Sequence, residues 1–219
     1  DDDAVAAVAA RAMGRVVTYG LDGGADVGAS AVVLDDHLRP SFMLHTPWGT
    51  AAVRLGVHGV HQVSNALAAA AAALAQGLDL AALVAGLADA ELSPWRMALA
   101  TAPSGARVLN DAYNANPTAM AAALGSLAAL PARRRIAVVG LMAELGEVSD
   151  ARHAEAGRLA DELGIEVISV DCPAYGTGRD VADIAAAEAA LADLGDGDAV
   201  LIKASRSVGL ERLAARLVT

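Results

Sequence analysis

The sequence predicts an α/β protein built from two parts. Short β-type stretches separated by turn residues fill the first part of the chain and end in two helices, whereas strands and helices alternate in the second part, as in a doubly wound parallel sheet. The pair Ser93-Pro94 interrupts the helical pattern between the two parts, because proline disfavours helix in the residue before it. We therefore expect one domain over 1–94 and a Rossmann-like domain over 95–219.

The first part is expected to form hairpins that are closed by helices. Its β-type stretches are 15–19, 31–34, 41–44 and 51–55, with Gly, Asp and Pro between them. After Gly59 the apolar residues recur with helical spacing, and the pattern breaks once, at Gly77. The two expected helices carry the apolar positions Val63, Leu67, Ala70 and Leu74, then Leu80, Leu83, Val84 and Leu87.

The second part alternates strand and helix patterns. The expected strands are 97–101, 107–110, 136–139, 167–170 and 199–202. The expected helices are 118–130, 151–163, 181–194 and 208–217. Continuous apolar runs such as Ile136-Ala137-Val138-Val139 suit strands buried on both faces, so a parallel sheet with right-handed crossovers is predicted.

The composition excludes several kinds of partner and indicates the compartment. A formal net charge of −10 would repel a phosphate backbone, so nucleic acid is not an expected partner. Although 55% of the residues are hydrophobic, no apolar run approaches the roughly 20 residues of a membrane span, and no membrane partner is expected. The single cysteine, Cys172, excludes an internal disulfide framework and suits a reducing compartment such as the cytoplasm, where it would be an inert small hydrophobe.

The chain opens on Asp1-Asp2-Asp3, without a methionine, a signal peptide or a lipidation motif. We expect it to be an excised part of a longer protein.

A dense polar cluster follows the strand expected at 107–110. Asn and Asp are common turn and N-cap residues, and Pro117 suits a first helical turn, so a structural role would account for one or two members of the cluster. It does not require Asp111, Tyr113, Asn114 and Asn116 together. Ligands of open α/β sheets bind at the carboxyl ends of strands, and we expect these side chains to bind one there.

The only lysine among sixteen basic residues, Lys203, ends a strand expected to be buried. Ser205, Arg206 and Ser207 follow it and precede a helix. Hydroxyls and a helix N-terminus favour negative groups, which predicts an anion site here, with a purely structural turn as the alternative.

The run Asp111-Ala112-Tyr113-Asn114-Ala115-Asn116-Pro117 resembles the Asp-x-Tyr-Asn-Ala-Asn-Pro motif of the MurF group within the Mur ligase family. Other segments resemble parts of that family and occur in the same order. Residues 59–70 resemble the start of a central-domain helix, and Arg96 resembles a hinge arginine. Residues 140–146 resemble a loop that follows a strand, and 203–207 resemble the end of the last strand. The resemblance spans the whole chain.

The resemblance implies an ATP-dependent amide ligase of peptidoglycan precursor synthesis. Such an enzyme phosphorylates the terminal carboxylate of UDP-MurNAc-tripeptide, and the amine of D-Ala-D-Ala then attacks the acyl phosphate. ATP and Mg²⁺ would be the cofactors, and the full-length protein would be a cytoplasmic monomer. The chemistry needs cations on the phosphates, a positioned amine and exclusion of water.

The resemblance also implies roles for particular residues. Asn65 would bind adenine with His61 beside it, Arg96 would reach the γ-phosphate, and Asp111 would accept the ribose hydroxyls. Tyr113, Asn114 and Asn116 would complete the nucleotide side. Lys203 would hold a substrate carboxylate and, with Arg96, belong to the catalytic machinery. The further substrate residues would be Ser205, Arg206, Ser207, Glu144 and His153.

Structural alternatives stay open for several of these residues. His61 could be a capping or core histidine, Arg96 an exposed linker residue, and Glu144 and His153 could face solvent. His58 and His61 are spaced like a metal pair, but no third ligand lies nearby in the sequence, so no metal site is expected.

The sequence departs from the family pattern at three positions. Gln62 stands where asparagine is usual, Leu141 where an acidic residue is usual, and Ala204 where glycine is usual. The sequence also contains no P-loop to hold a triphosphate. In the family the P-loop and the metal ligands lie upstream, so we expect the 219-residue chain by itself neither to hydrolyse ATP nor to form the amide bond.

Two other functions are compatible with parts of this pattern. A folylpolyglutamate or cyanophycin type of ligase shares the reaction but not the acceptor, and the Tyr-Asn-Ala-Asn-Pro run argues against it. A non-catalytic nucleotide-binding α/β module would be permitted by Leu141 and by the missing P-loop.

Overall fold

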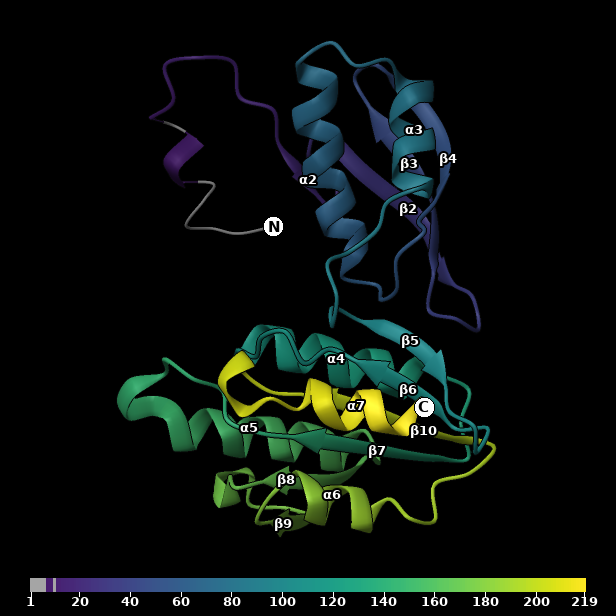
Figure 1. Cartoon of the computed structure of the whole chain (residues 1–219). Helices are drawn as coiled ribbons and strands as arrows, with labels where there is room; N and C mark the ends of the chain where they lie inside the picture. The colour runs from purple at the N-terminus through teal and green to yellow at the C-terminus, as the bar shows by residue number, and fades with distance from the viewer. Residues whose placement is uncertain (1–6, 10) are drawn as a thin grey trace. The chain divides into compact units, whose positions relative to one another are not determined.

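The computed structural model describes residues 7–9 and 11–219, so the opening Asp1-Asp2-Asp3 lies outside the described part. The chain divides into two compact units, the first ending at Glu91 and the second running from Leu92 to Thr219 (Figure 1). Each unit has a sheet and a hydrophobic core of its own.

The first unit is built on a four-stranded sheet in the order β1-β2-β3-β4. These strands are β1 (Tyr19–Gly20), β2 (Val27–Leu34), β3 (Pro40–Thr46) and β4 (Gly49–Arg54). β1 is parallel to β2, and the remaining pairs are antiparallel. The strand expected over 15–19 is wrong apart from Tyr19, because the Asp26 carboxylate, and no neighbouring strand, accepts the N–H of Thr18 at 2.8 Å.

Two helices cover this sheet, α2 (Gln62–Ala75) and α3 (Leu80–Ala88). Asp79 caps α3 by accepting the N–H groups of Ala81 and Ala82, which otherwise have no intrahelical partner. The expected apolar stripe is confirmed, and its residues pack against the strands. The shared core includes Val27, Phe42, Leu44, Val53, Val63, Leu67, Leu74 and Leu83.

The second unit contains a six-stranded sheet in the order β5-β6-β10-β7-β8-β9. Its strands are β5 (Ala98–Thr101), β6 (Arg107–Asn110), β7 (Arg134–Val139), β8 (Glu166–Val170), β9 (Arg179–Val181) and β10 (Asp198–Lys203). All neighbouring pairs are parallel except β5 with β6. The predicted α/β class with a parallel sheet is confirmed.

Four α-helices connect or follow these strands: α4 (Pro117–Ala129), α5 (Ser149–Glu162), α6 (Ile184–Ala190) and α7 (Glu211–Leu217). Three short 3₁₀ turns lie at 146–148, 173–175 and 206–208. The helix expected over 181–194 is wrong at both ends, since α6 covers only Ile184–Ala190. Val181 pairs with Val170 in the unexpected strand β9, and the Asp183 side chain starts the helix by capping Ala186 N–H.

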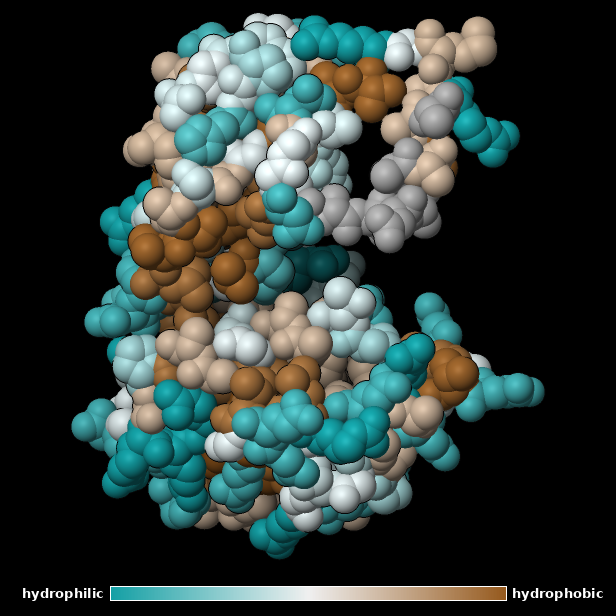
Figure 2. All heavy atoms as spheres, turned by 180° about the vertical axis from the view of Figure 1, so that it is seen from behind, coloured by the Kyte–Doolittle hydropathy of each residue, from teal (hydrophilic) through white to brown (hydrophobic). Residues whose placement is uncertain are grey.

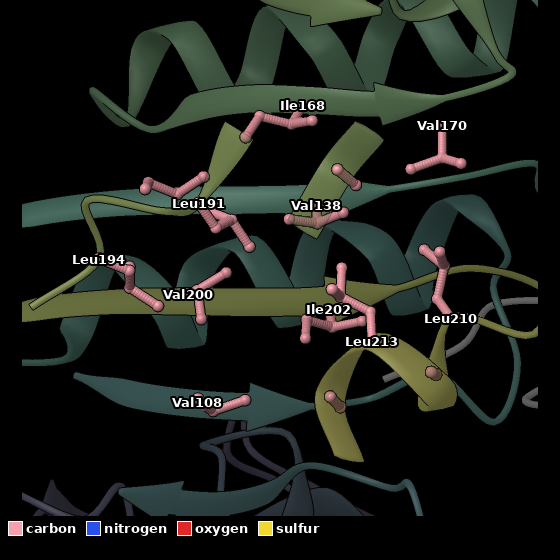
Figure 3. Close-up of a cluster of buried hydrophobic side chains, with 14 of the residues drawn as sticks. Val108, Val138, Ile168, Val170, Leu191, Leu194, Val200, Ile202, Leu210 and Leu213 are labelled. Atoms are coloured by element: carbon pink, nitrogen blue, oxygen red, sulfur yellow. The ribbon is translucent and has the colours of Figure 1, made fainter. Parts of the chain in front are cut away.

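The sheet of the second unit is buried on both faces. On one face Val138, Ile168, Val200 and Ile202 meet apolar residues of α6 and α7 and of the segments beside these helices, such as Leu191 and Leu213 (Figure 3). The alternate residues of the same strands, including Val139 and Leu201, are buried as well, as expected for side chains that point to opposite faces of a covered sheet. Because β6, β10 and β7 are parallel neighbours, the loops after these strands emerge at the same carboxyl edge of the sheet.

Among the described residues, no helix combines the length and the apolar character that a bilayer crossing needs.

Two helical glycines provide a test of packing in the second unit. A Cβ at Gly157 in α5 would overlap the carbonyl oxygen of Tyr175, whereas a Cβ at Gly125 in α4 would meet no atom within 4 Å. We expect Gly157→Ala to lower the free energy of unfolding by about 1–3 kcal/mol through overpacking. Gly125→Ala should raise it by about 0.5–1 kcal/mol, because alanine loses less backbone entropy than glycine in a helix.

The measurement is urea unfolding of both variants beside the unmodified chain. Equal stability of the two variants would contradict the close approach of α5 to the 173–175 turn.

Candidate functional site

The candidate site lies at the carboxyl edge of the second unit's sheet. Three loops meet there, and we call them the edge loops. The first edge loop is 111–116 after β6, the second is 140–146 after β7, and the third is 204–208 after β10. Ser205 donates its N–H to Leu141 O at 2.9 Å, and Gly140 donates its N–H to Lys203 O at 3.1 Å. The loops are thus joined by backbone hydrogen bonds as well as by side chains.

Lys203 lies inside this edge, with 1% of its surface exposed. Its Nζ is 2.5 Å from Asp111 Oδ2, 2.8 Å from the carbonyl oxygen of Asn114 and 3.5 Å from that of Asp111. An ammonium has three N–H donors and no acceptor, so the first edge loop offers an oxygen for each of them. The structure therefore places the group expected to hold a substrate carboxylate against the chain's own loop.

Asp111 is bonded through both of its carboxylate oxygens. While Oδ2 faces Lys203, Oδ1 accepts the N–H of Met97 at 3.0 Å. The side chain keeps 14% of its surface exposed. Because each carboxylate oxygen has two lone pairs, Asp111 retains acceptor capacity toward a hydroxyl donor on the exposed side.

Ser205 and His153 hold the second edge loop. The hydroxyl oxygen of Ser205 accepts the N–H of Ala143 at 2.9 Å, and Nε2 of His153 accepts the N–H of Met142 at 2.8 Å. Since a backbone N–H can only donate, the proton of the neutral ring lies on Nδ1, which then donates to Ser149 O at 2.8 Å. With 0% of its surface exposed, His153 reaches no solvent in this unit.

Tyr175 completes the support of the second edge loop, a role that the sequence did not reveal. Its hydroxyl donates to the carbonyl oxygen of Gly140 at 2.9 Å, and its ring stands edge-on to His153 with centroids 5.1 Å apart. Burial raises the pKa of this phenol, so the hydroxyl stays a donor. No local pattern signals the role, because Gly140 is 35 positions away.

Glu144 is exposed at the tip of the second edge loop, in the left-handed region with φ of 66°. Non-glycine residues with this conformation carry strain and are held by their surroundings. The bonds from Ala143 to Ser205 and from Met142 to His153 supply that constraint just before Glu144. The loop thus presents Glu144 to solvent from a backbone that is held just before it.

Two arginines of the second unit stack on aromatic rings. Arg96 lies over the ring of Tyr113, 3.9 Å from its centroid, and donates from Nε to Ser93 Oγ at 2.9 Å. Arg206 lies over the ring of Trp95 at 4.0 Å and pairs with Glu211 at 2.7 Å. Such cation–π contacts contribute about 0.5–1 kcal/mol at exposed sites and orient the guanidinium.

Sequence reasoning did not identify Trp95 and Ser93 as site residues. A signal existed for Trp95, since it is one of two tryptophans and directly precedes Arg96. Its backbone conformation is also unusual, with φ of 63°, and that of Met97 has φ of 51°. The carbonyl oxygen of Trp95 accepts the N–H of Tyr113 at 3.1 Å, so the 95–97 segment is fastened to the first edge loop at two points.

Of the remaining motif residues, one caps a helix and the others are exposed. Asn116 caps α4 by accepting the N–H of Ala119 at 2.8 Å, which agrees with the structural alternative for this residue. Asn114 gives its carbonyl oxygen to Lys203 and keeps an exposed side chain. Tyr113 is 39% exposed, and the guanidinium of Arg96 lies over its ring.

His61 and Asn65 lie in the first unit, where Gln62 links them. The side-chain oxygen of Gln62 accepts from Asn65 Nδ2 at 2.9 Å, and its nitrogen is 3.1 Å from His61 Nε2. Gln62 is buried, whereas Asn65 is exposed on the first turn of α2. The longer amide of Gln62 therefore orders the histidine and asparagine on one helix end.

A cavity of about 590 Å³ opens beside the edge loops within the second unit. Leu141 and Ser207 line it together with Asp171, Asp183 and Arg212. Leu141 is 42% exposed. Figure 2 shows one face of the chain, on which hydrophobic and hydrophilic side chains are intermixed. At the position where the family pattern has an acidic residue, Leu141 adds an apolar side chain to a lining that also contains charged residues.

The described residues form neither a metal cluster nor a reactive thiol at the site. They contain no group of three or more His, Cys, Asp and Glu side chains able to hold a metal ion. Cys172 is buried, and burial together with the nearby carboxylate of Asp180 raises the pKa of its thiol to about 11. The thiol is therefore protonated at neutral pH, as expected for a structural cysteine.

Comparison with protein families gives two matches to this chain. Residues 95–206 match the model for the Mur ligase glutamate ligase domain, and residues 1–73 match the model for the Mur ligase middle domain.

Curated relatives and solved structures agree with these matches. The chain is 41% identical to UDP-N-acetylmuramoyl-tripeptide--D-alanyl-D-alanine ligase of Mycobacterium tuberculosis, covering 100% of the chain and 49% of the relative. It is 39% identical to the Escherichia coli ligase of the same name, covering 80% and 41%. The chain thus spans about half the length of the relatives it matches.

Solved structures of MurF ligases share the fold, and two of them are compared with the chain. MurF from Acinetobacter baumannii superimposes with a TM-score of 0.85 at 31% identity, over 93% of this chain and 47% of the other. MurF from Thermotoga maritima in complex with ADP also gives 0.85, at 25% identity, over 99% and 51%.

Two serines of the third edge loop form a matched pair for measurement. Ser205 is buried and bonded to Ala143, whereas Ser207 is exposed. We expect Ser205→Ala to lower the free energy of unfolding by about 1–3 kcal/mol, because it leaves a partly buried N–H without its partner. Ser207→Ala should change it by less than about 0.5 kcal/mol.

Guanidinium chloride unfolding of both variants checks this pair. If Ser205→Ala is as stable as Ser207→Ala, the second edge loop is not held by the serine.

Proposed function

The chain belongs to the Mur ligase family, and from that premise we propose that it works as part of an ATP-dependent ligase that joins D-Ala-D-Ala to UDP-MurNAc-tripeptide. The observation that carries this proposal is the assembly of the Asp111–Pro117 motif with Arg96 at one edge of the sheet, where the guanidinium lies 3.9 Å from the Tyr113 ring centroid. The names of the relatives from Mycobacterium tuberculosis and Escherichia coli support the choice of acceptor and amine.

The proposed reaction has two steps. The terminal carboxylate of the tripeptide takes the γ-phosphoryl group of ATP and releases ADP. The amine of D-Ala-D-Ala then attacks the acyl phosphate, so that a C–N bond forms while the C–O bond to phosphate breaks and the amine gives up a proton. Because little covalent chemistry falls to the protein, its task is to position the reactants and to stabilise negative charge.

We place the nucleotide against the first edge loop and the 95–97 segment. Asp111 keeps lone pairs for the ribose hydroxyls, Tyr113, Asn114 and Asn116 line the same side, and Arg96 carries the exposed cation for the γ-phosphate. In the first unit, Asn65 and His61 are proposed for the adenine base. The Thermotoga maritima relative in complex with ADP supports a nucleotide as the ligand of this fold.

We place the substrates against the exposed side chains of the other edge loops. Arg206 and Ser207 provide a cation and a hydroxyl for a carboxylate, and Glu144 provides an acceptor for an amine. Ser205 and His153 contribute through the loop that they hold, since both are buried and bonded to it.

Phosphoryl transfer of this kind uses Mg²⁺, but the described residues provide no cluster of ligands for it. The side chains of this chain are therefore assigned no step that acts on the metal. We propose that the complete protein is cytoplasmic, because UDP-linked precursors and ATP are both cytoplasmic metabolites. We also propose that it acts as a monomer.

Turnover of the protein expressed from its complete gene tests the proposal. With UDP-MurNAc-tripeptide and ATP present, D-Ala-D-Ala should support phosphate release and formation of the pentapeptide product, detected by mass spectrometry. L-Glu and single D-Ala should support less than about one hundredth of that rate, because the dipeptide carboxylate would reach its cation only with the correct length. Turnover with glutamate in preference to the dipeptide would instead favour a folylpolyglutamate type of ligase.

Substitution of two arginines tests whether turnover depends on this site. Arg96→Met should lower kcat/KM by about 10²–10³-fold, the usual loss when a group that stabilises transition-state charge is removed. Arg158→Met removes an exposed arginine that belongs to α5 and to none of the edge loops, and should leave kcat/KM within about twofold. Equal losses of kcat/KM in both variants would show that Arg96 has no specific part in the reaction. If the unmodified protein shows no turnover with any amine, a non-catalytic binding module is indicated instead.

A further inference from the structure

We propose that Lys203 is a positioning residue, which fixes the first edge loop and through it Arg96, and that it does not bind the substrate carboxylate itself. Its kinetic consequence rests on the proposed function. This role replaces the carboxylate role that the sequence suggested for Lys203.

The ammonium of Lys203 is directed toward the chain's own oxygens. Lys203 donates to the side chain of Asp111 at 2.5 Å and to the carbonyl oxygen of Asn114 at 2.8 Å, so one cation bridges the two ends of a tight turn. The carbonyl oxygen of Asp111 is the third acceptor, at 3.5 Å. A substrate carboxylate would have to displace one of these partners from a group that is 1% exposed.

Hydrogen bonds connect Asp111 to the segment that carries Arg96. The other oxygen of Asp111 holds the N–H of Met97, and the carbonyl oxygen of Trp95 holds the N–H of Tyr113. Arg96 stands between these two attachment points, and both of its neighbours have positive φ. Because strained backbone persists only where its surroundings hold it, loosening Asp111 should release the segment that carries Arg96.

The choice of lysine at this position agrees with a positioning role. This chain uses arginine at fifteen of its sixteen basic positions, yet lysine stands here. A compact ammonium directs its donors toward three separated oxygens, whereas the planar fork of a guanidinium is suited to two parallel bonds with one anion. The geometry around Lys203 is of the first kind.

Amide hydrogen exchange in the 219-residue chain tests the positioning role without any enzyme activity. In Lys203→Met the N–H groups of Met97 and Tyr113 should exchange at least about tenfold faster, because Asp111 loses its anchor. The N–H of Met142, which His153 holds at the same edge, is the internal control and should change less than about twofold. Unchanged protection of Met97 and Tyr113 would overturn the proposal.

The double variant Lys203→Met with Asp111→Asn guards against a folding failure, since it leaves no unpaired buried charge. Its Met97 N–H should still exchange faster than in the unmodified chain, because nothing then fixes residue 111 to β10. Protection equal to that of the unmodified chain would again count against a positioning role.

Kinetics of the protein from the complete gene distinguish positioning from direct binding. Positioning predicts that Lys203→Met lowers kcat and kcat/KM for ATP at least about tenfold while the KM for D-Ala-D-Ala stays within about threefold. A rise in the dipeptide KM with unchanged kcat and unchanged ATP parameters would show direct carboxylate binding. If the unmodified protein has no turnover, the proposed function fails, and the exchange experiment still decides the role of Lys203.

Discussion

A buried ammonium at the end of a central strand is the constraint on which the carboxyl edge of the second unit depends. Removing two charges from water is costly, and the attraction between Lys203 and Asp111 offsets this cost only where further hydrogen bonds satisfy the remaining donors and lone pairs. Here the carbonyl oxygen of Asn114 and the N–H of Met97 provide those bonds. The pair therefore requires the loop after β6 and the segment before β5 to lie where they do, and either would lose its support if the other moved.

The edge is organised in two layers of polar side chains. The inner layer consists of Lys203, Ser205 and His153, all buried and all bonded to the edge loops. The outer layer consists of exposed residues, namely Arg96, Tyr113, Asn114, Glu144 and Arg206. A reaction that depends on positioning and electrostatics benefits from this division, because side chains that meet ligands are accurate only when the backbone beneath them is fixed.

Sequence patterns were sufficient for the parallel sheet and for the polar run 111–116, since both depend on neighbouring residues. They were insufficient for contacts set by strand register. Lys203 reaches Asp111 only because β10 lies beside β6, although the two residues are 92 positions apart, and Tyr175 reaches Gly140 across 35 positions. The same limit explains the wrong strand over 15–19, where the side chain of Asp26 accepts the N–H of Thr18 and no partner strand does. It also explains why the sequence did not reveal that His153 and Ser205 hold the second edge loop.

The most direct measurement of the central constraint is a double-mutant cycle on the free energy of unfolding of this chain, with Lys203→Met, Asp111→Asn and both together. If the ammonium and the carboxylate stabilise the edge as a pair, each single substitution leaves a buried charge uncompensated. The double variant should then lose less than the sum of the single losses, with a coupling of about 1–3 kcal/mol. Losses that add to within about 0.5 kcal/mol would show that Lys203 and Asp111 act independently, and the carboxyl edge would then not depend on their pairing.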